Sequence, residues 1–114
     1  MKIEIFTHEN KEYLIQIGKN KEENDKLCDT SLATDVWFHL ENEPSCHVVL
    51  KNIDNLKLRD IPRQVIKRCS YLCKINSKSK NESKSKIMYT RMENVKKTSQ
   101  IGQVLVEIYK IVFV

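Results

Sequence analysis

The sequence predicts an α+β domain, a mostly antiparallel sheet with one principal amphipathic helix and a short N-terminal helix. Three observations support this fold class. Several short runs alternate apolar and polar residues and are separated by turn residues, which is typical of strands joined in hairpins. One longer run places apolar residues at helical spacing. The chain has 114 residues, a length that fits one domain, so we expect residues 1–114 to fold as a single unit.

Two alternating runs near the start of the chain predict the first hairpin. Residues 2–7 and 13–17 alternate as strands do, and the opening run does not look like the apolar centre of a signal peptide. Gly18 ends the second run. The polar stretch 21–28 suits a short helix, with Asn20 as its capping residue.

The stretch Asp35–His39 and its partner Ser45–Leu50 predict a central hairpin with a five-residue turn between them. Trp37 and His39 are two residues apart, so on a strand both side chains leave the same face. The turn would bring His47 opposite them. We therefore expect an indole and two imidazoles to lie close together.

A helical stripe after this hairpin predicts the principal helix. Asp60 is the candidate N-cap, and Pro62 falls in the first turn, where its missing N–H costs little. The apolar stripe consists of Ile61, Val65, Ile66, Cys69, Leu72 and Cys73. The opposite face, which we expect to meet solvent, carries Arg59, Arg63, Lys67, Arg68 and Lys74.

The rest of the chain predicts a basic loop followed by short strands. Residues 78–86 hold no apolar residue, so this stretch can bury nothing and we expect a mobile loop. Residues 87–90, 104–106 and 109–114 read as strands, and the apolar C-terminal run must be paired or covered.

The net charge of +5 hides a strong asymmetry along the chain. Residues 1–56 hold six Lys or Arg against eleven Asp or Glu, whereas residues 57–97 hold thirteen against three. A basic block in a small domain is the electrostatic footprint of a polyanion binder, although a solvated lysine-rich face is the simpler alternative. The predicted phosphate contacts are Arg63, Lys67, Arg68, Lys74, Lys78, Lys80, Lys84, Lys86, Lys96 and Lys97.

Three readings of the aromatic and imidazole residues stay open. His39 and His47 are either a general acid–base pair, ligands for a phosphate or base, or hydrogen-bonded structural residues. Asp35 shares the parity of Trp37, so its carboxylate is expected to hold an imidazole proton and raise that pKa. Trp37 itself is either a stacking platform for a base or part of the core, with the core favoured.

The cysteine pattern does not indicate a metal site or a disulfide framework. Cys28, Cys46, Cys69 and Cys73 include no Cys-x-x-Cys pair, and the last two lie on the apolar stripe. Reduced thiols in a cytosolic or nuclear protein fit this pattern. We expect no metal and no cofactor, and no apolar run approaches the roughly 18 residues of a membrane span.

Taken together, the motifs resemble the NFACT-R domain family. The residues that carry the resemblance keep their order over nearly the whole chain: Ile15–Asn20 with Asn24 and Leu27, Asp35–His39, Ser45–Val48, Lys86–Thr90, Asn94–Thr98 and Gly102–Val104. Asp60–Pro62 is similar to the helix start of its short coiled-coil domain-containing protein 25 group.

The resemblance implies a non-catalytic nucleic-acid-binding module in the cytoplasm, related to the NEMF ribosome quality-control factors. Its expected partner is structured RNA, either tRNA or ribosomal RNA, in translation or ribosome quality control. Three alternatives remain: DNA binding, a protein–protein module on ribosome-associated complexes, and an RNA-processing enzyme that uses Asp35, His39 and His47. Besides the basic residues named above, the expected interface contains Lys19, Asn20, Asp35, Trp37, His39 and His47.

Overall fold

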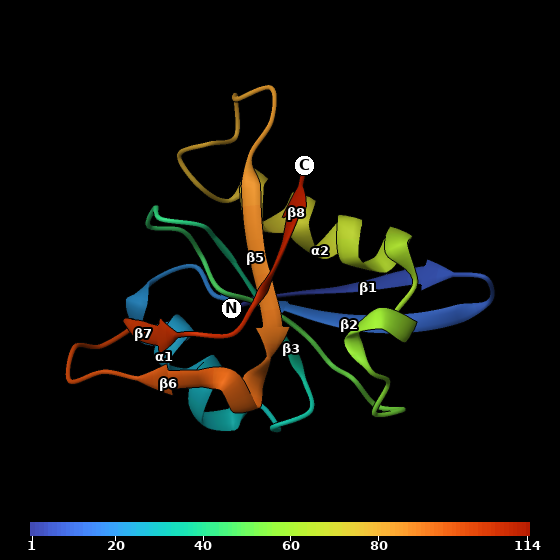
Figure 1. Ribbon diagram of the computed structural model, residues 1–114, viewed down its shortest axis with the longest axis horizontal. Helices are drawn as coiled ribbons and strands as arrows, with labels where there is room; N and C mark the ends of the chain where they lie inside the picture. The colour runs from blue at the N-terminus through green and yellow to red at the C-terminus, as the bar shows by residue number, and fades with distance from the viewer.

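The computed structural model describes residues 1–114 and contains a six-stranded sheet, a two-stranded sheet and two α-helices (Figure 1). In chain order, the elements are β1 (Lys2–His8), β2 (Lys11–Ile17), α1 (Lys21–Thr30), β3 (Val36–Leu40), β4 (Val48–Leu50), α2 (Arg63–Ile75), β5 (Lys86–Arg91), β6 (Val95–Lys97), β7 (Val104–Val106) and β8 (Lys110–Phe113). Short 3₁₀ turns span Leu58–Asp60 and Met92–Asn94.

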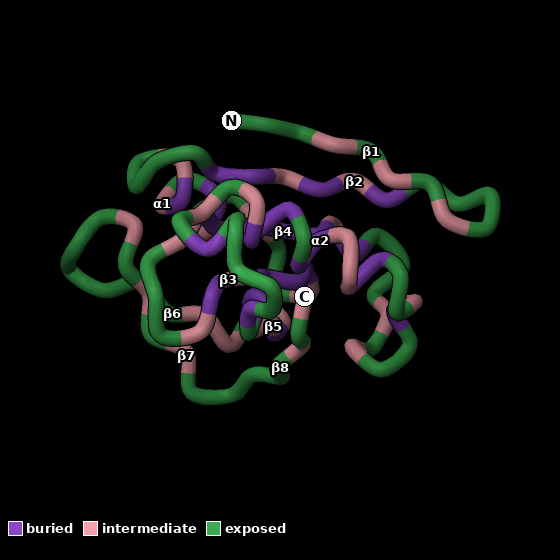
Figure 2. The backbone as a smooth tube through the Cα atoms, turned by 90° about the horizontal axis from the view of Figure 1, so that it is seen from above, coloured by how far each residue is buried: buried purple, intermediate pink, exposed green.

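The large sheet has the strand order β1-β2-β4-β3-β5-β8, and each neighbouring pair is antiparallel. β3 lies between β4 and β5, with Trp37 opposite both Val49 and Thr90. Strand β1 forms one edge and has no fully buried residue, whereas buried residues gather in the central strands (Figure 2). Central placement explains why β3 is almost entirely buried.

One face of the large sheet packs against α2. The even-numbered residues Val36, Phe38 and Leu40 of β3 point to this face, as strand parity requires. The whole predicted stripe is buried against them, with Leu72 only 1 % exposed, although its first member, Ile61, precedes α2. This is the main core of the molecule, so the predicted interior face of the helix is confirmed.

The other face is covered by α1 and the small β6–β7 sheet, on the opposite side of β3 from α2 (Figure 1). Here the buried apolar residues are only Leu27, Trp37, Val49 and Met92. Trp37 is 1 % exposed, which confirms that the indole is a core residue. Neither helix has the length and apolar character needed to cross a membrane.

The predicted fold class is wrong in its description of the helices. No short helix stands at the N-terminus, because β1 and β2 come first. The first helix, α1, has ten residues against thirteen in α2, and eight strands form two sheets. The short helix expected over residues 21–28 is present as α1, with Asn20 as its N-cap, but it follows two strands and buries only Asn24 and Leu27.

Three local expectations are also wrong. Asp60 lies in a 3₁₀ turn, and Pro62 caps α2, its carbonyl accepting from Val65 and Ile66. β4 begins only at Val48, so His47 precedes the strand. Lys74 does not face solvent: it is 7 % exposed, and its Nζ donates to the carbonyl oxygen of Val114 at 3.0 Å.

Candidate functional site

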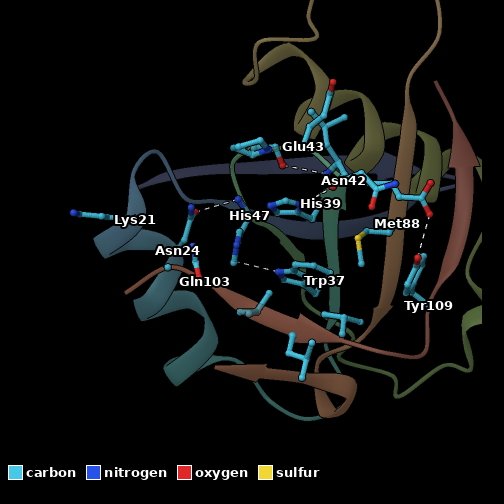
Figure 3. A pocket seen from close by; sticks show the side chains of 18 of the residues that line it. Lys21, Asn24, Trp37, His39, Asn42, Glu43, His47, Met88, Gln103 and Tyr109 are labelled. Atoms are coloured by element: carbon cyan, nitrogen blue, oxygen red, sulfur yellow. Dashed lines mark hydrogen bonds between the residues drawn. The ribbon is translucent and has the colours of Figure 1, made fainter. Parts of the chain in front are cut away.

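Trp37, His39 and His47 form a cluster of three rings on the α1 side of the large sheet (Figure 3). The His39 ring stacks on the indole, with centroids 5.4 Å apart and 13° between the planes. His47 meets both rings edge-on, and Trp37 Nε1 donates to His47 Nδ1 at 3.1 Å. The predicted proximity of the three side chains is confirmed, and we call them the ring cluster.

The hydrogen bonds of the ring cluster fix the tautomer of each imidazole. His47 Nδ1 accepts the indole proton, so a neutral His47 ring carries its proton on Nε2. His39 Nδ1 lies 2.6 Å from the carbonyl oxygen of Leu40, which can only accept, so its proton is on Nδ1. The cluster therefore presents one N–H donor, from His47, and one nitrogen acceptor, from His39.

Both imidazoles are neutral near neutral pH. Burial lowers the pKa of His39, against the smaller opposing effect of the Leu40 carbonyl. Burial, and secondarily a charge on nearby His39, lowers the pKa of His47 to about 3. The ring cluster is therefore not a cationic site for phosphate at neutral pH.

Asp35 does not join the ring cluster, so the expectation that it raises an imidazole pKa is wrong. Its Oδ2 accepts from Lys51 Nζ at 2.8 Å and from the Leu32 N–H at 2.9 Å. Its Oδ1 accepts from the Asn52 N–H at 3.0 Å. These bonds tie the start of β3 to the segment after β4, so the buried carboxylate is used for structure.

Asn24 of α1 and Gly18 hold the backbone of His47 in place. Asn24 Oδ1 accepts the His47 backbone N–H at 3.1 Å, and the Gly18 N–H donates to the His47 carbonyl at 2.9 Å. A Cβ at Gly18 would lie 2.2 Å from Asn24 Oδ1, so only glycine leaves room for this amide. Asn24 was not among the predicted site residues, although it belongs to the motif that includes Gly18.

A cavity of about 640 Å³ opens beside the ring cluster, and we call it the ring cavity (Figure 3). Met88 of β5 and residues 101–106 around β7 form its apolar side. Glu41, Glu43 and Tyr109 stand along another side, where Tyr109 Oη donates to Glu41 at 3.2 Å. This cavity was not predictable from the sequence, because its walls come from segments that are distant along the chain.

A shallower depression of about 360 Å³ adjoins the ring cavity, and the two share Lys21, Asn24, Pro44 and Ser45 as lining residues. Lys19, Asn20, Lys21 and Lys78 line it, and no Asp or Glu does. We call it the lysine depression. Predicted site residues that are distant along the chain, Lys19 and Asn20 on one side and Lys78 on the other, meet here.

A second basic surface lies along α2 and the edge strand β8, in a groove of about 570 Å³ that we call the α2–β8 groove. Arg59, Arg63, Lys67 and Lys84 line it together with Tyr89 and Phe113. Lys84 and Lys86 each place Nζ 5.8 Å from the centre of the Phe113 ring, which is 45 % exposed. Neither these four lining cations nor Lys86 forms an ion pair with a carboxylate.

Other predicted phosphate contacts have partners within the chain. Arg68 forms two hydrogen bonds of 2.7 Å to Glu4, which lower the pKa of that carboxyl group. Lys97 Nζ contacts Asp25 and Asp29 at 3.1 and 2.8 Å. Lys80 and Lys96 are exposed but line neither surface. The remaining predicted contacts are divided between the α2–β8 groove and the ring cavity with its lysine depression.

No group of three or more His, Cys, Asp or Glu side chains lies close enough together to hold a metal ion. All four cysteines are free, and Cys28 Sγ lies 3.9 Å from His47 Nδ1. Cys46 and Cys73 each point Sγ at the other's carbonyl oxygen, at 3.7 and 3.6 Å.

Comparison with known proteins decides the family. The family model described as "NFACT protein RNA binding domain" matches residues 2–107. The chain belongs to the NFACT RNA-binding domain family. The resemblance inferred from the sequence motifs is therefore confirmed.

Relatives of this NFACT domain include coiled-coil domain-containing protein 25 of Bos taurus, 36 % identical over 95 residues that make up 81 % of this chain and 46 % of the relative. The Rqc2 homolog RqcH of Bacillus subtilis is 30 % identical over 84 residues, 73 % of this chain but 14 % of that protein. The chain thus spans less than half the length of these relatives.

The NFACT fold is also seen in a solved structure, that of the C-terminal part of the fibronectin/fibrinogen-binding protein from Streptococcus suis. It superposes with a TM-score of 0.84 and covers 100 % of this chain and 45 % of that one, at 23 % identity. At this identity, the likeness concerns the fold.

The NFACT motifs converge on the ring cluster. Three separate motifs supply residues that contact one another here: Gly18 and Asn24 from the first, Trp37 and His39 from the second, and His47 from the third. By contrast, Tyr89 and Phe113 of the α2–β8 groove were missed, because strand parity does not reveal that β8 pairs with β5 beside α2.

Proposed function

We propose that this chain is a non-catalytic RNA-binding module that holds the RNA backbone in the α2–β8 groove. The carrying observation is a set of five cations without a carboxylate partner, four lining the groove and Lys86 beside it, of which Lys84 and Lys86 lie over the exposed Phe113 ring. Lys and Arg side chains without a carboxylate partner neutralise phosphates, and an exposed ring can stack on a base. Lys67 Nζ donates to the carbonyl oxygen of Phe113 at 2.6 Å, which leaves its positive charge uncompensated by any carboxylate. Membership of a family described as RNA-binding supports this function.

The proposed ligand is structured RNA, either tRNA or ribosomal RNA, and the proposed setting is translation or ribosome quality control in the cytoplasm. A relative named as an Rqc2 homologue supports this setting. The absence of an Asp–His pair supports a binding role over catalysis, because Asp35 is bonded to Lys51 and two backbone amides. A neutral, buried His47 is also a poor proton carrier near pH 7.

The test compares two double variants with the same charge change. Lys67→Gln/Lys84→Gln removes two cations that line the groove, whereas Lys2→Gln/Lys26→Gln removes two exposed lysines outside it. Affinity for a tRNA, a ribosomal RNA hairpin and a DNA duplex is measured at several salt concentrations. The groove variant should lose roughly 0.7 to 0.9 in log–log salt slope for each phosphate contact removed, and the control should keep the wild-type slope.

Equal slopes in the two double variants would show that the groove does not hold the backbone. Tighter binding of the DNA duplex than of either RNA would replace RNA by DNA as the ligand. A further variant, Lys78→Ser/Lys80→Ser/Lys84→Ser/Lys86→Ser, measures what the predicted basic loop adds. Its slope should also flatten, because two of the four lysines, Lys84 and Lys86, lie at the groove.

A further inference from the structure

The proposed binding of the RNA backbone in the α2–β8 groove leaves the ring cavity without a role. Polar side chains, including His39, His47 and Gln103, line this cavity. It opens on the α1 side of the large sheet, whereas the groove lies against α2. Its volume of about 640 Å³ falls within the roughly 300–1,000 Å³ of small-ligand sites. A cavity of this size that is lined by rings and amides calls for a ligand of matching chemistry.

The strongest sign of a ligand is an unpaired donor on a buried side chain. His47 is 1 % exposed and lines the ring cavity. Its Nδ1 accepts from Trp37, which leaves the proton on Nε2, and no group of the chain accepts that proton. His47 Nε2 is not one of the chain's enclosed polar atoms without a partner, so this donor reaches the open cavity, where a ligand can accept its proton in place of solvent.

The neighbouring groups complete a pattern that fits a nucleobase. His39 is partly buried, stacks on Trp37 and keeps Nε2 as an acceptor, 5.2 Å from His47 between ring centres. Gln103 adds an amide at the cavity wall. Unstacked RNA bases are planar and neutral, present donors beside acceptors, and are commonly held by stacking on His or aromatic rings.

The charges around the cavity separate a base site from a phosphate site. Both imidazoles are neutral, and Glu41 and Glu43 stand on one side, so the ring cavity itself does not favour an anion. The lysine depression next to it holds Lys19, Lys21 and Lys78 and no carboxylate. None of these three lysines forms an ion pair.

We propose that the ring cavity takes one unstacked nucleobase of the bound RNA, while the adjoining phosphate lies on Lys19, Lys21 and Lys78. This inference rests on the proposed RNA-binding function and extends it. The α2–β8 groove holds the backbone of the structured part, and the ring cavity captures a single unpaired nucleotide. The chain would then prefer RNA that has an unpaired end or a bulge over a fully paired stem.

The test uses the only Trp of the chain as its signal, because Trp37 forms the floor of the ring cluster. Two RNAs share one stem and differ only in a short unpaired 3′ overhang. The overhang RNA should change Trp37 fluorescence saturably and bind roughly tenfold more tightly than the blunt RNA, the scale expected for one stacked base. On binding, the His47 Nε2–H signal should also shift in an imidazole NMR spectrum.

Two variants separate the base site from the phosphate site. His39→Ala removes the stacking ring and should abolish the preference for the overhang. Lys19→Gln/Lys78→Gln changes only exposed side chains, so it should keep the wild-type melting temperature while weakening overhang binding severalfold. The blunt stem should bind both variants as it binds the wild type, and the groove variant Lys67→Gln/Lys84→Gln should weaken both RNAs equally.

The outcomes distinguish this inference from the proposed function. Equal affinity for the two RNAs, with no Trp37 response and no effect of either variant, would overturn the base site and leave backbone binding intact. Failure of both RNAs to bind would overturn both proposals. Saturable Trp37 quenching by an arginine-containing peptide, without a response to the overhang, would also overturn the base site and assign the acidic side of the cavity to a protein partner.

Discussion

The two faces of the large sheet are covered in different ways, although one strand contributes to both. On the α2 face, Val36, Phe38 and Leu40 join a cluster of sixteen buried apolar residues. On the α1 face, Trp37 joins only three others, and polar groups such as His47 and Asn24 are buried beside them. The comparison indicates that the α2 face supplies most of the stability, and that the sparse apolar cover of the α1 face leaves room for a polar cavity.

The sharpest test compares one fully buried leucine on each face. Leu72→Ala in α2 should cost about 4–5 kcal/mol of unfolding free energy, and Leu27→Ala in α1 about 2–3 kcal/mol, within the range for such substitutions. The difference is expected because the smaller cluster next to a cavity can relax around the lost atoms. Denaturant unfolding measures both values, with exposed Leu105→Ala as the neutral control. A larger loss in Leu27→Ala would reverse the assignment of the faces.

A second test uses pH, because the α1 face buries a neutral imidazole. The folded pKa of His47, about 3, lies below its usual value of 6.5, so the unfolded chain binds the proton more tightly. This contribution to stability is full above pH 6.5 and is lost as the pH falls toward 3, by about 1.4 kcal/mol per unit. At pH 5, the loss from His47 should be about 2 kcal/mol.

The measurement is the unfolding free energy from pH 7 to 4.5 in the wild type, His47→Gln and the control His8→Gln. The His47 variant should show a shallower decline than the other two proteins. An identical decline in all three would mean that His47 does not titrate as a buried neutral group. RNA affinity should stay nearly flat between pH 8 and 7, because burial lowers the pKa of both cluster imidazoles below the usual 6.5.

The smallest expected effect concerns the ion pair that joins β1 to α2. Arg68→Ala removes two hydrogen bonds to Glu4, but both side chains are partly solvated, so the loss should be about 1 kcal/mol or less. The RNA affinity of Arg68→Ala should fall less than that of the groove variant Lys67→Gln/Lys84→Gln, because the Arg68 guanidinium is already paired with the Glu4 carboxylate. A thermal melt and one titration at fixed salt check both statements. A loss comparable to that of Leu72→Ala would show that ion pairs, rather than apolar contacts, hold α2 on the sheet.

Much of the candidate site follows from local patterns. Strand parity alone places Trp37 and His39 on one face, and a short turn is enough to bring His47 beside them. The charge asymmetry drew attention to Arg63, Lys67 and Lys84, which line one groove. The partners of the other basic residues were not predictable, because they are distant along the chain. The partner of Arg68 is 64 positions away and that of Lys74 is 40 positions away. The two partners of Lys97 are 72 and 68 positions away.

By itself, the sequence determined the apolar face of α2, the parity of β3 and the family, since each is a matter of spacing between neighbouring residues. Only the tertiary structure decided that Asp35 bonds Lys51 rather than an imidazole, that Phe113 lies among lysines, and that a cavity opens beside the rings. These features depend on the order of strands in the sheet and on which segment covers each face. Such pairings are set by packing over the whole chain, and the spacing of apolar residues along the sequence does not predict them.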